Sequence, residues 1–431
     1  MYVRSLKINS LRCFGSADLT LQYPARKDVS PLHARNVNLL LGDNGAGKTT
    51  VLRALALATL SPIMSRSAGY VPYHMVRHGA SQALVSADVL LNAQDMGSKA
   101  APRMGSHVTA QLGVTIARSR DVEFVEASPG PGRRRFDEMF NDMSPAFLVV
   151  GYGATRRVED AASFSPNEQL KRRLLRYQRV AGLFETHIAL TPLTAWLPRL
   201  RKRNPGRYKQ VINLIDRLLP EDAIFEGRQE REPEGEYLFR VGGTAAPFGA
   251  LSDGYRAYIG WVADLLYNVC MGCPKGARLV ENCGLVLVDE IDLHLHPEWQ
   301  RSVVSTLSRA LPNLQFVFTT HSPIVAGSLQ SENIFVMERD SSGASVIRQY
   351  AERIYGLDAQ QVLLSSYFGL ESTRAPGFFD EIQKLSRGLK KGRSDVALKI
   401  MKRLSGQPED GVEGPVAGPA PAKSLRRPRP R

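Results

Sequence analysis

The spacing of apolar and polar residues predicts a chain that alternates between strands and helices. Residues 2–9 and 17–23 alternate apolar and polar side chains, which is typical of a half-buried β-hairpin. Val37–Leu41 is a short apolar run that ends at Gly42, as expected of a buried strand that enters a loop. Thr49–Leu60 follows with helical character. The N-terminal part therefore predicts a hairpin, a buried strand and a helix in that order.

Strand-like and helical patterns continue along the chain. Between the strand-like segments, residues 166–219 place Leu, Arg and Lys at three-to-four-residue spacing, which indicates helices interrupted by Pro192, Pro198 and Pro205. Helical character returns from Ala351 to about Leu404. The further predicted strands are residues 83–91, 107–117, 147–150, 237–241, 285–288, 315–319 and 334–337.

This layout predicts an α/β core that is split by a helical insertion. A Ser-Pro-Gly-Pro-Gly run at residues 128–132 indicates a loop, and the Gly/Pro/Ala-rich remainder beyond Leu404 has the composition of a disordered tail. The predicted parts are an N-terminal lobe (1–160), a basic helical insertion (161–230), a C-terminal lobe (231–345), a helical segment (346–405) and a disordered basic tail (406–431).

The positive charge is concentrated in two places. Lysine and arginine exceed aspartate and glutamate by 14 over the 431 residues. Residues 199–209 carry six positive charges without an acid, and the last nine residues carry five more. Such clusters favour a polyanionic partner, nucleic acid first and an acidic protein surface second. The alternative is a solvated helix face and a tail that only improve solubility.

Cysteine content and hydropathy favour a soluble cytoplasmic protein. Four cysteines are too few for a disulfide scaffold. The longest apolar stretch, residues 257–272, contains Asp264 and Asn268 and therefore predicts a buried helix rather than a membrane span. The N-terminal residues lack the apolar stretch of a signal peptide. We expect no membrane association.

The strongest chemical motif is a complete G-x-x-x-x-G-K-[ST] pattern between the predicted strand and helix. Its glycines allow backbone N–H groups to converge on phosphate oxygens, and the helix N-terminus adds positive potential. Lys48 is expected to bridge the β- and γ-phosphates, and the Thr49 hydroxyl to bind Mg²⁺. The motif consists of Gly42, Asp43, Asn44, Gly45, Ala46, Gly47, Lys48 and Thr49. It predicts binding of ATP with Mg²⁺.

A second motif ends the apolar strand at residues 285–288. Asp289 follows this strand and is expected to hold the metal through water, and Glu290 is placed to orient or deprotonate the attacking water. An apolar strand that ends in Asp-Glu is common, but beside a phosphate-binding loop it becomes specific.

Two shorter motifs complete the set. Leu251-Ser252-Asp253-Gly254-Tyr255 opens a helix, and a Ser and a Gly at a helix N-terminus make a second anion-binding surface. Because one site has little use for two such surfaces, this one is expected to contact nucleotide held by another subunit. His321, in Thr-Thr-His-Ser-Pro after the strand at 315–319, is placed to contact the γ-phosphate.

Taken in order, GDNGAGKTT, LSDGY, LVLVDEIDLHLHP and TTHSP resemble the motifs of the ABC-class ATPases of the RecF, SMC and OLD-nuclease group, over roughly residues 1–345. The sequence is most similar to the short ATPases of Septu-type and retron-associated antiviral systems. This resemblance implies an α/β fold, an ABC-type P-loop NTPase head. Its parts would be a mixed sheet with an antiparallel β subdomain, a helical lid insertion and C-terminal helices.

In that family two heads dimerise head to tail around two ATP molecules. The resemblance implies catalytic roles for Lys48, Glu290 and His321, with Thr49 and Asp289 at the metal. It makes Asp292 a dimer-interface acid. It assigns Arg12 and every residue from Gly42 through Thr50 to the nucleotide. Ser252 and Gly254 would contact the same nucleotide from the second subunit.

The sequence also departs from the family patterns. Asp253 and Tyr255 replace the glycine and glutamine of the transporter motif, and no clear glutamine loop is present. Residues 151–156 stand where such a loop is expected, and Arg156 is a candidate nucleotide sensor. The long coiled-coil arms of SMC proteins and the acidic Toprim domain of OLD nucleases are missing, so any nuclease activity is expected from another chain.

Cysteines and histidines near the second motif raise the question of a zinc site. They are Cys270, Cys273, Cys283, His294 and His296. Because His294 and His296 belong to the family's interface pattern and the Cys270–Cys273 pair ends an apolar helix, we expect buried thiols and packed histidines.

Two functions are consistent with the sequence. The first is an ATP-hydrolysing switch in antiviral defence that dimerises around ATP and controls a separate nuclease or toxin subunit. The second is a RecF-like ATPase of DNA repair or replication that binds DNA, to which the basic insertion points. A scaffold with a degraded site is disfavoured by Lys48, Asp289 and Glu290, which are all present.

Overall fold

The computed structural model describes residues 1–26, 33–64, 74–92, 95, 108–120, 122–127, 147–158, 176–228, 237–375 and 377–378. Met1–Leu370 form one compact unit, and Glu371–Arg431 form a second. The fold and the site below belong to the first unit. Four predicted parts lie outside the described residues: the loop at 128–132, residues 161–175 of the insertion, residues 379–405 of the C-terminal helical segment, and the tail at 406–431.

A mixed sheet of eleven strands forms the centre of the first unit, in the order β6-β5-β4-β1-β2-β16-β15-β3-β14-β13-β7. The strands are β1 (Tyr2–Leu11), β2 (Phe14–Thr20), β3 (Val37–Gly42), β4 (Gln82–Leu91), β5 (Val108–Ser119), β6 (Val122–Ala127), β7 (Leu148–Tyr152), β13 (Gly284–Val288), β14 (Leu314–Thr319), β15 (Ile334–Arg339) and β16 (Ser345–Arg348). Nine of them match predicted strands within a few residues, whereas β6 and β16 have no predicted counterpart. The antiparallel β subdomain that the resemblance implies is continuous with the parallel strands in this one sheet.

The sheet has a parallel half and an antiparallel half. Strands β7, β13, β14, β3 and β15 pair in parallel, whereas β2, β1, β4, β5 and β6 pair antiparallel. The parallel strands are apolar throughout because both of their faces are covered. In β3, for example, Leu39 and Leu41 point into one hydrophobic core and Leu40 into the other. The carboxyl ends of β3, β14 and β13 therefore meet at one edge.

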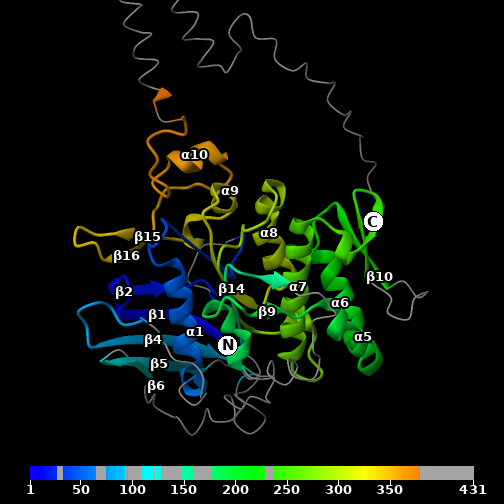
Figure 1. The fold of residues 1–431 in the computed structure, drawn as a ribbon, viewed down its shortest axis with the longest axis horizontal. Helices are drawn as coiled ribbons and strands as arrows, with labels where there is room; N and C mark the ends of the chain where they lie inside the picture. The colour runs from blue at the N-terminus through cyan, green and yellow to red at the C-terminus, as the bar shows by residue number, and fades with distance from the viewer. Residues whose placement is uncertain are drawn as a thin grey trace, which may run out of the picture. The chain divides into compact units, whose positions relative to one another are not determined.

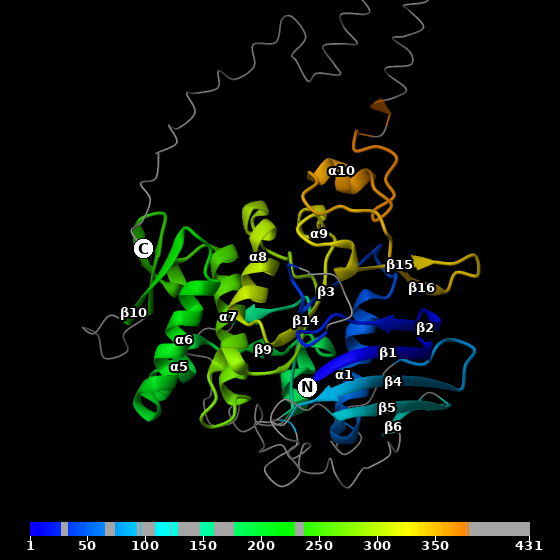
Figure 2. The ribbon, with the colours of Figure 1, turned by 180° about the vertical axis from the view of Figure 1, so that it is seen from behind.

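Helices cover both faces of the sheet. α1 (Lys48–Met64) packs on the face that includes β4 and β5. On the other face, α7 (Asp253–Met271) lies between the sheet and the pair α5 (Leu193–Arg203) and α6 (Pro205–Leu218), as both ribbon views show (Figures 1 and 2). Helices α8 (Pro297–Ala310) and α9 (Pro323–Ala326) also pack against each other. Among the described residues, no helix combines the length and the apolar character needed to cross a membrane.

The described part of the predicted insertion is less helical than expected. Residues 176–190 form two short 3-10 turns, η3 (Arg176–Arg179) and η4 (Ala181–Leu183), and the two-residue strand β9 (Ala189–Leu190), which pairs with β8 (Arg157–Val158). Pro205, expected as a helix breaker, occupies the first turn of α6, where proline is tolerated. After α6, β10 (Ala223–Arg228), β11 (Tyr237–Val241) and β12 (Thr244–Pro247) form a small antiparallel sheet.

The predicted C-terminal helix from Ala351 is wrong for the described residues. Among the described residues of 351–378, α10 (Ala359–Leu364) is the one helix of several residues. It ends at Ser365, whose backbone is extended with φ of −76° and ψ of 172°. Tyr367 packs in the core instead of on a helix face, and its hydroxyl donates to the carbonyl oxygens of Tyr350 and Glu352.

Candidate nucleotide-binding site

The loop between β3 and α1 has the backbone of a phosphate-binding loop. Gly42, Gly45 and Gly47 have φ of 139°, 78° and 108°, which side chains other than glycine rarely adopt. The ammonium group of Lys48 donates to the carbonyl oxygens of Gly42 (2.7 Å) and Asp43 (3.0 Å) and so folds back over the loop. Burial lowers the pKa of Lys48, and the nearby carboxylates, Asp289 foremost, oppose that shift.

Oxygen donors from three elements meet at the carboxyl edge of the sheet. The Thr49 hydroxyl, in the first turn of α1, donates to Asp289 Oδ2 (2.7 Å). The Thr319 hydroxyl, at the end of β14, donates to Asp289 Oδ1 (2.6 Å). Asp289 is almost fully buried. A hydroxyl beside a carboxylate is a set of hard oxygen ligands that suits Mg²⁺, so these residues fit the predicted metal.

Glu290 has an unusual backbone that two side chains hold. Its φ is 51°, in the left-handed region, which costs a non-glycine residue of order 1–3 kcal/mol. Its N–H donates to Thr319 Oγ1 (2.7 Å), and its carbonyl oxygen accepts from Arg156 Nη2 (2.8 Å). Both polar groups of the Glu290 backbone are thus satisfied by side chains.

The next threonine organises the segment beyond Glu290. The Thr320 hydroxyl donates to Asp292 Oδ1 and accepts from the Ser322 N–H (3.0 Å). The Ser322 hydroxyl then donates to Gln300 Oε1 on α8 (2.6 Å). Asp292, predicted at the dimer interface, is therefore fixed in its own chain by the motif that contains the histidine.

These groups line a cleft of about 780 Å³. His321 is exposed at its edge, and Arg12 lines it with φ of 49° while its Nε donates to the His74 carbonyl oxygen (3.2 Å). The lining residues are Arg12, Cys13, Asn44, Gly45, Gly47, Lys48, Thr49, Thr50, Asp289, Glu290 and His321. Both motif acids thus lie together with eight other predicted residues: Arg12, Asn44, Gly45, Gly47, Lys48, Thr49, Thr50 and His321.

Ser252 and Gly254 lie elsewhere. Ser252 is exposed and precedes the first turn of α7. A Cβ at Gly254 would stand 3.2 Å from the His294 carbonyl oxygen, so the helix start lies directly against the segment after Glu290. The Tyr255 ring packs edge-on against Trp299 with 4.5 Å between centroids. Among the described residues, the two predicted phosphate contacts of this motif are therefore on the surface, outside the cleft of their own chain.

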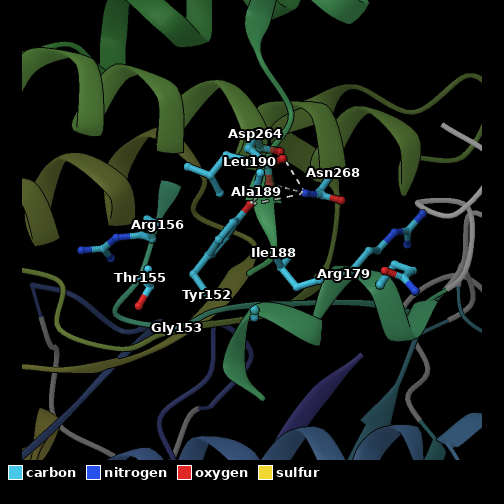
Figure 3. A pocket seen from close by; sticks show the side chains of 13 residues that line it. Tyr152, Gly153, Thr155, Arg156, Arg179, Ile188, Ala189, Leu190, Asp264 and Asn268 are labelled. Carbon is cyan, nitrogen blue, oxygen red and sulfur yellow. Dashed lines mark hydrogen bonds between the residues drawn. The ribbon is translucent and has the colours of Figure 1, made fainter. Parts of the chain in front are cut away.

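Arg156 connects the cleft to α7. It follows β7, and its guanidinium lies 5.6 Å from the centre of the Trp261 ring. Burial lowers the pKa of Arg156 to about 10, although the carboxylates of Asp292, Asp289 and Glu290 act to raise it. A second, much smaller cavity lies beside it. Figure 3 shows the Tyr152 phenol pointing toward Asp264 and Asn268 of α7, whereas Arg156 extends away from them.

Sequence patterns did not predict roles for Thr319, Thr320 and Cys13. A signal for the first two was present, because two hydroxyl residues end an apolar strand directly before His321. The register Val288↔Phe318 between β13 and β14 then places Asp289 beside Thr319. Cys13 lines the cleft only because the β1–β2 turn folds against the phosphate loop.

The cysteines and histidines considered for zinc are dispersed. Burial raises the pKa of the Cys273 thiol and that of Cys270, the latter to about 11. Cys283 accepts from the Tyr2 hydroxyl (3.2 Å). The expectation of packed histidines is wrong, because His294 and His296 are exposed in the segment that leads to α8. In the part of the chain that the structure describes, no three potential ligands form a metal-binding group.

Two known family models match the chain over separate ranges. Residues 147–326 match the family model described as "AAA domain, putative AbiEii toxin, Type IV TA system", and residues 5–94 match a second AAA domain model. Together the two matches contain the phosphate loop, the acidic strand and the histidine motif.

Individual relatives point the same way. The Septu protein PtuA of Bacillus mycoides is 26% identical over 336 residues, which are 78% of this chain and 41% of that protein. The probable ATPase of retron Vc95 from Vibrio cholerae is 40% identical over 107 residues, 25% of this chain and 21% of that protein. The corresponding ATPase of retron Ec83 from Escherichia coli is 38% identical over 88 residues, 20% and 16% of the two chains. The chain is an ABC-class AAA ATPase related to these defence ATPases.

The fold agrees with that assignment. A crystal structure of an SMC head bound to the C-winged helix domain of ScpA matches with a TM-score of 0.50 and 15% identity, over 81% of this chain and 98% of that chain. At this identity the match shows the ABC-type head fold alone. The matched regions span less than half the length of the defence relatives.

Proposed function

We propose that this ATPase hydrolyses ATP with Mg²⁺ in a head-to-tail homodimer and acts as a switch for a separate effector. One observation carries the proposal: the cleft holds both motif acids and the phosphate loop, whereas the exposed Ser252 and the half-buried Gly254 lie outside it. A second copy turned by a two-fold axis would bring its Ser252 and Gly254 onto the open side of the cleft. The α7 N-terminus would then add its N–H groups and positive potential to the γ-phosphate.

The residues of the cleft suit ATP hydrolysis. Lys48 and the loop N–H groups neutralise phosphate charge, and Thr49 and Asp289 would hold the metal, which would supply further positive charge to stabilise the transferring phosphate. Glu290 orients and deprotonates the attacking water. His321, at the edge of the cleft, contacts the γ-phosphate and reports its presence to α9 through the adjoining Ser322.

The kinds of protein that are similar to this chain support the effector role. A Septu protein and two retron ATPases are similar to this chain, and the family model described with a putative AbiEii toxin matches residues 147–326, which include both motif acids and His321. We therefore propose a nuclease or toxin on a separate chain as the partner.

The substitution Glu290→Gln tests the catalytic part of the proposal. The variant keeps every contact to ground-state nucleotide but cannot accept the proton of water, so ATP binding is retained, turnover falls about a hundredfold or more, and an ATP-bound dimer accumulates. Phosphate release and size-exclusion chromatography with multi-angle light scattering measure both effects. Glu126→Gln, on the exposed edge strand β6, is the matched control. Parental hydrolysis by the Glu290 variant would refute the assigned base.

A second function, DNA binding in repair or replication, is favoured by one surface. Arg199, Arg201, Lys202, Arg203 and Lys209 are exposed where α5 ends and α6 begins. If DNA binds there, replacing Arg201, Lys202 and Arg203 by Ala lowers affinity for duplex DNA, and the salt dependence of binding becomes shallower by about three phosphate contacts. Fluorescence anisotropy at several salt concentrations measures this change. Unchanged affinity and slope would remove this function.

A further inference from the structure

One of the two side chains that hold the Glu290 backbone, Arg156, lies outside the four predicted motifs. The left-handed φ of 51° is unfavourable for glutamate, so the surrounding structure must maintain it. Thr319 binds the N–H side of the residue, and it belongs to the neighbouring strand β14. Arg156 binds the carbonyl side, and it comes from the loop after β7, on the other side of β13. Glu290 is thus held from both neighbours of its own strand.

Arg156 has several contacts that suit it for this role. Its Nη2 donates to the Glu290 carbonyl oxygen (2.8 Å) and its Nη1 reaches the Asp289 carbonyl oxygen (3.4 Å). Its guanidinium plane also lies over the Trp261 ring of α7 at 5.6 Å, a cation–π distance. Lysine offers a single ammonium in place of a planar fork, so it cannot reproduce both backbone contacts together with the ring contact.

The loop that carries Arg156 is itself attached to α7. Tyr152, four residues earlier, donates through its hydroxyl to Asp264 Oδ2 (2.8 Å), and Figure 3 shows this bond within the cluster around Asn268. The Tyr152 carbonyl oxygen accepts from the Asp289 N–H (2.8 Å). Residues 152–156 therefore contact α7 on one side and the Asp289–Glu290 backbone on the other, with buried and directional contacts at each step.

We propose that Arg156 is a positioning residue that holds Glu290 in its catalytic conformation and ties this conformation to the position of α7. The inference rests on the proposed ATP-bound dimer, in which the N-terminus of α7 contacts nucleotide in the partner's cleft. Nucleotide bound by the partner then acts through α7, Trp261 and Arg156 on the glutamate of this chain. Hydrolysis in the two clefts is coupled, and Arg156 acts through Glu290 rather than on the phosphates.

The experiment compares Arg156→Lys and Arg156→Ala with Arg157→Lys, an exposed neighbour, in the full-length chain. Steady-state kinetics with ATP give kcat, KM and the Hill coefficient, and a fluorescent ATP analogue gives nucleotide affinity. For both Arg156 variants we expect kcat to fall about tenfold or more, affinity to stay within about twofold, and the Hill coefficient to approach one. Arg157→Lys should match the parent. Guanidinium ion at millimolar concentration should partly restore kcat of Arg156→Ala but not of Glu290→Gln.

The outcomes separate the inference from the function beneath it. Parental kcat and Hill coefficient in Arg156→Lys and Arg156→Ala overturn the inference while leaving the dimeric ATPase intact. A loss of nucleotide affinity equal to the loss of kcat also overturns it, since direct phosphate binding or a general loss of structure would produce that pattern. If Glu290→Gln hydrolyses ATP at the parental rate, the proposed function itself fails.

Discussion

At the scale of single residues, the two threonines before His321 arrange the acids of the neighbouring strand. Thr319 joins Asp289 to the Glu290 backbone, and Thr320 holds Asp292. Each hydroxyl donates once and accepts once, a capacity that valine lacks at nearly the same volume. The acids that the sequence identified as catalytic candidates thus owe their orientation to hydroxyls that a motif search passes over.

Thr319→Val should therefore impair hydrolysis strongly. The substitution leaves the buried Glu290 N–H and one Asp289 oxygen without partners, which costs about 1–3 kcal/mol for each group. We expect kcat to fall about tenfold or more. We also expect activity to respond less to added Mg²⁺, and a steady-state assay over a range of metal concentrations measures both effects. Thr319→Ser keeps the hydroxyl and should remain close to the parent. Equal activity of the valine and serine variants would contradict this role.

At the scale of elements, α7 is fixed to the sheet by a buried carboxylate. Asp264 accepts from the Tyr152 hydroxyl (2.8 Å), the Asn268 side-chain amide (2.8 Å) and the Thr191 N–H (2.6 Å). Three donors meet two carboxylate oxygens, so this helix is connected to β7 and to the segment after β9 at one point. The same residue gave the sequence its argument against a membrane span.

Asp264→Asn should loosen this connection. The amide has nearly the same shape, but its NH₂ group faces a donor where an oxygen had accepted, which costs about 1–3 kcal/mol. We expect the free energy of unfolding in urea to drop by that amount. Asp253→Asn, at the exposed start of the same helix, should change it by less than about 0.5 kcal/mol. A buried variant as stable as the exposed one would show that the network contributes nothing net.

At the scale of the whole molecule, the proposed site is shared between two chains. The cleft and the α7 N-terminus of one copy are separate surfaces, and an isologous pair uses each surface twice. The matched relatives extend well beyond the region that they share with this chain. The partner and the trigger of this chain are therefore proposed and do not follow from those relatives.

Ser252→Arg should block this assembly. A long cation at the N-terminus of α7 occupies the space expected for the partner's γ-phosphate and opposes the helix dipole. In the Glu290→Gln background with ATP and Mg²⁺, we expect a monomer by light scattering and unchanged nucleotide affinity. Ser81→Arg, at the exposed position just before β4, is the control and should dimerise. Dimerisation of the Ser252 variant would argue against the shared site.

Local sequence was sufficient for much of the fold and for the chemical identity of the site. The strand and helix around the phosphate loop follow from patterning and glycine spacing, because their structure depends on neighbours in the chain. The same holds for the apolar strand before Asp289. Local pattern failed beyond Ala351, where α10 ends after six residues at an extended Ser365, and around residues 176–190, where two short 3-10 turns and a two-residue strand replace the predicted helix.

Tertiary structure alone decided how these motifs act together. Strand order brings β3, β14 and β13 side by side from positions almost 280 residues apart, and register then sets Thr319 against Asp289. The contacts of Arg156 with Glu290 and Trp261 depend on three separate elements, so no spacing rule in the chain encodes them. Motifs specify which chemistry is present, because backbone and side-chain type are local properties. Orientation and coupling require packing, which is set by distant parts of the chain.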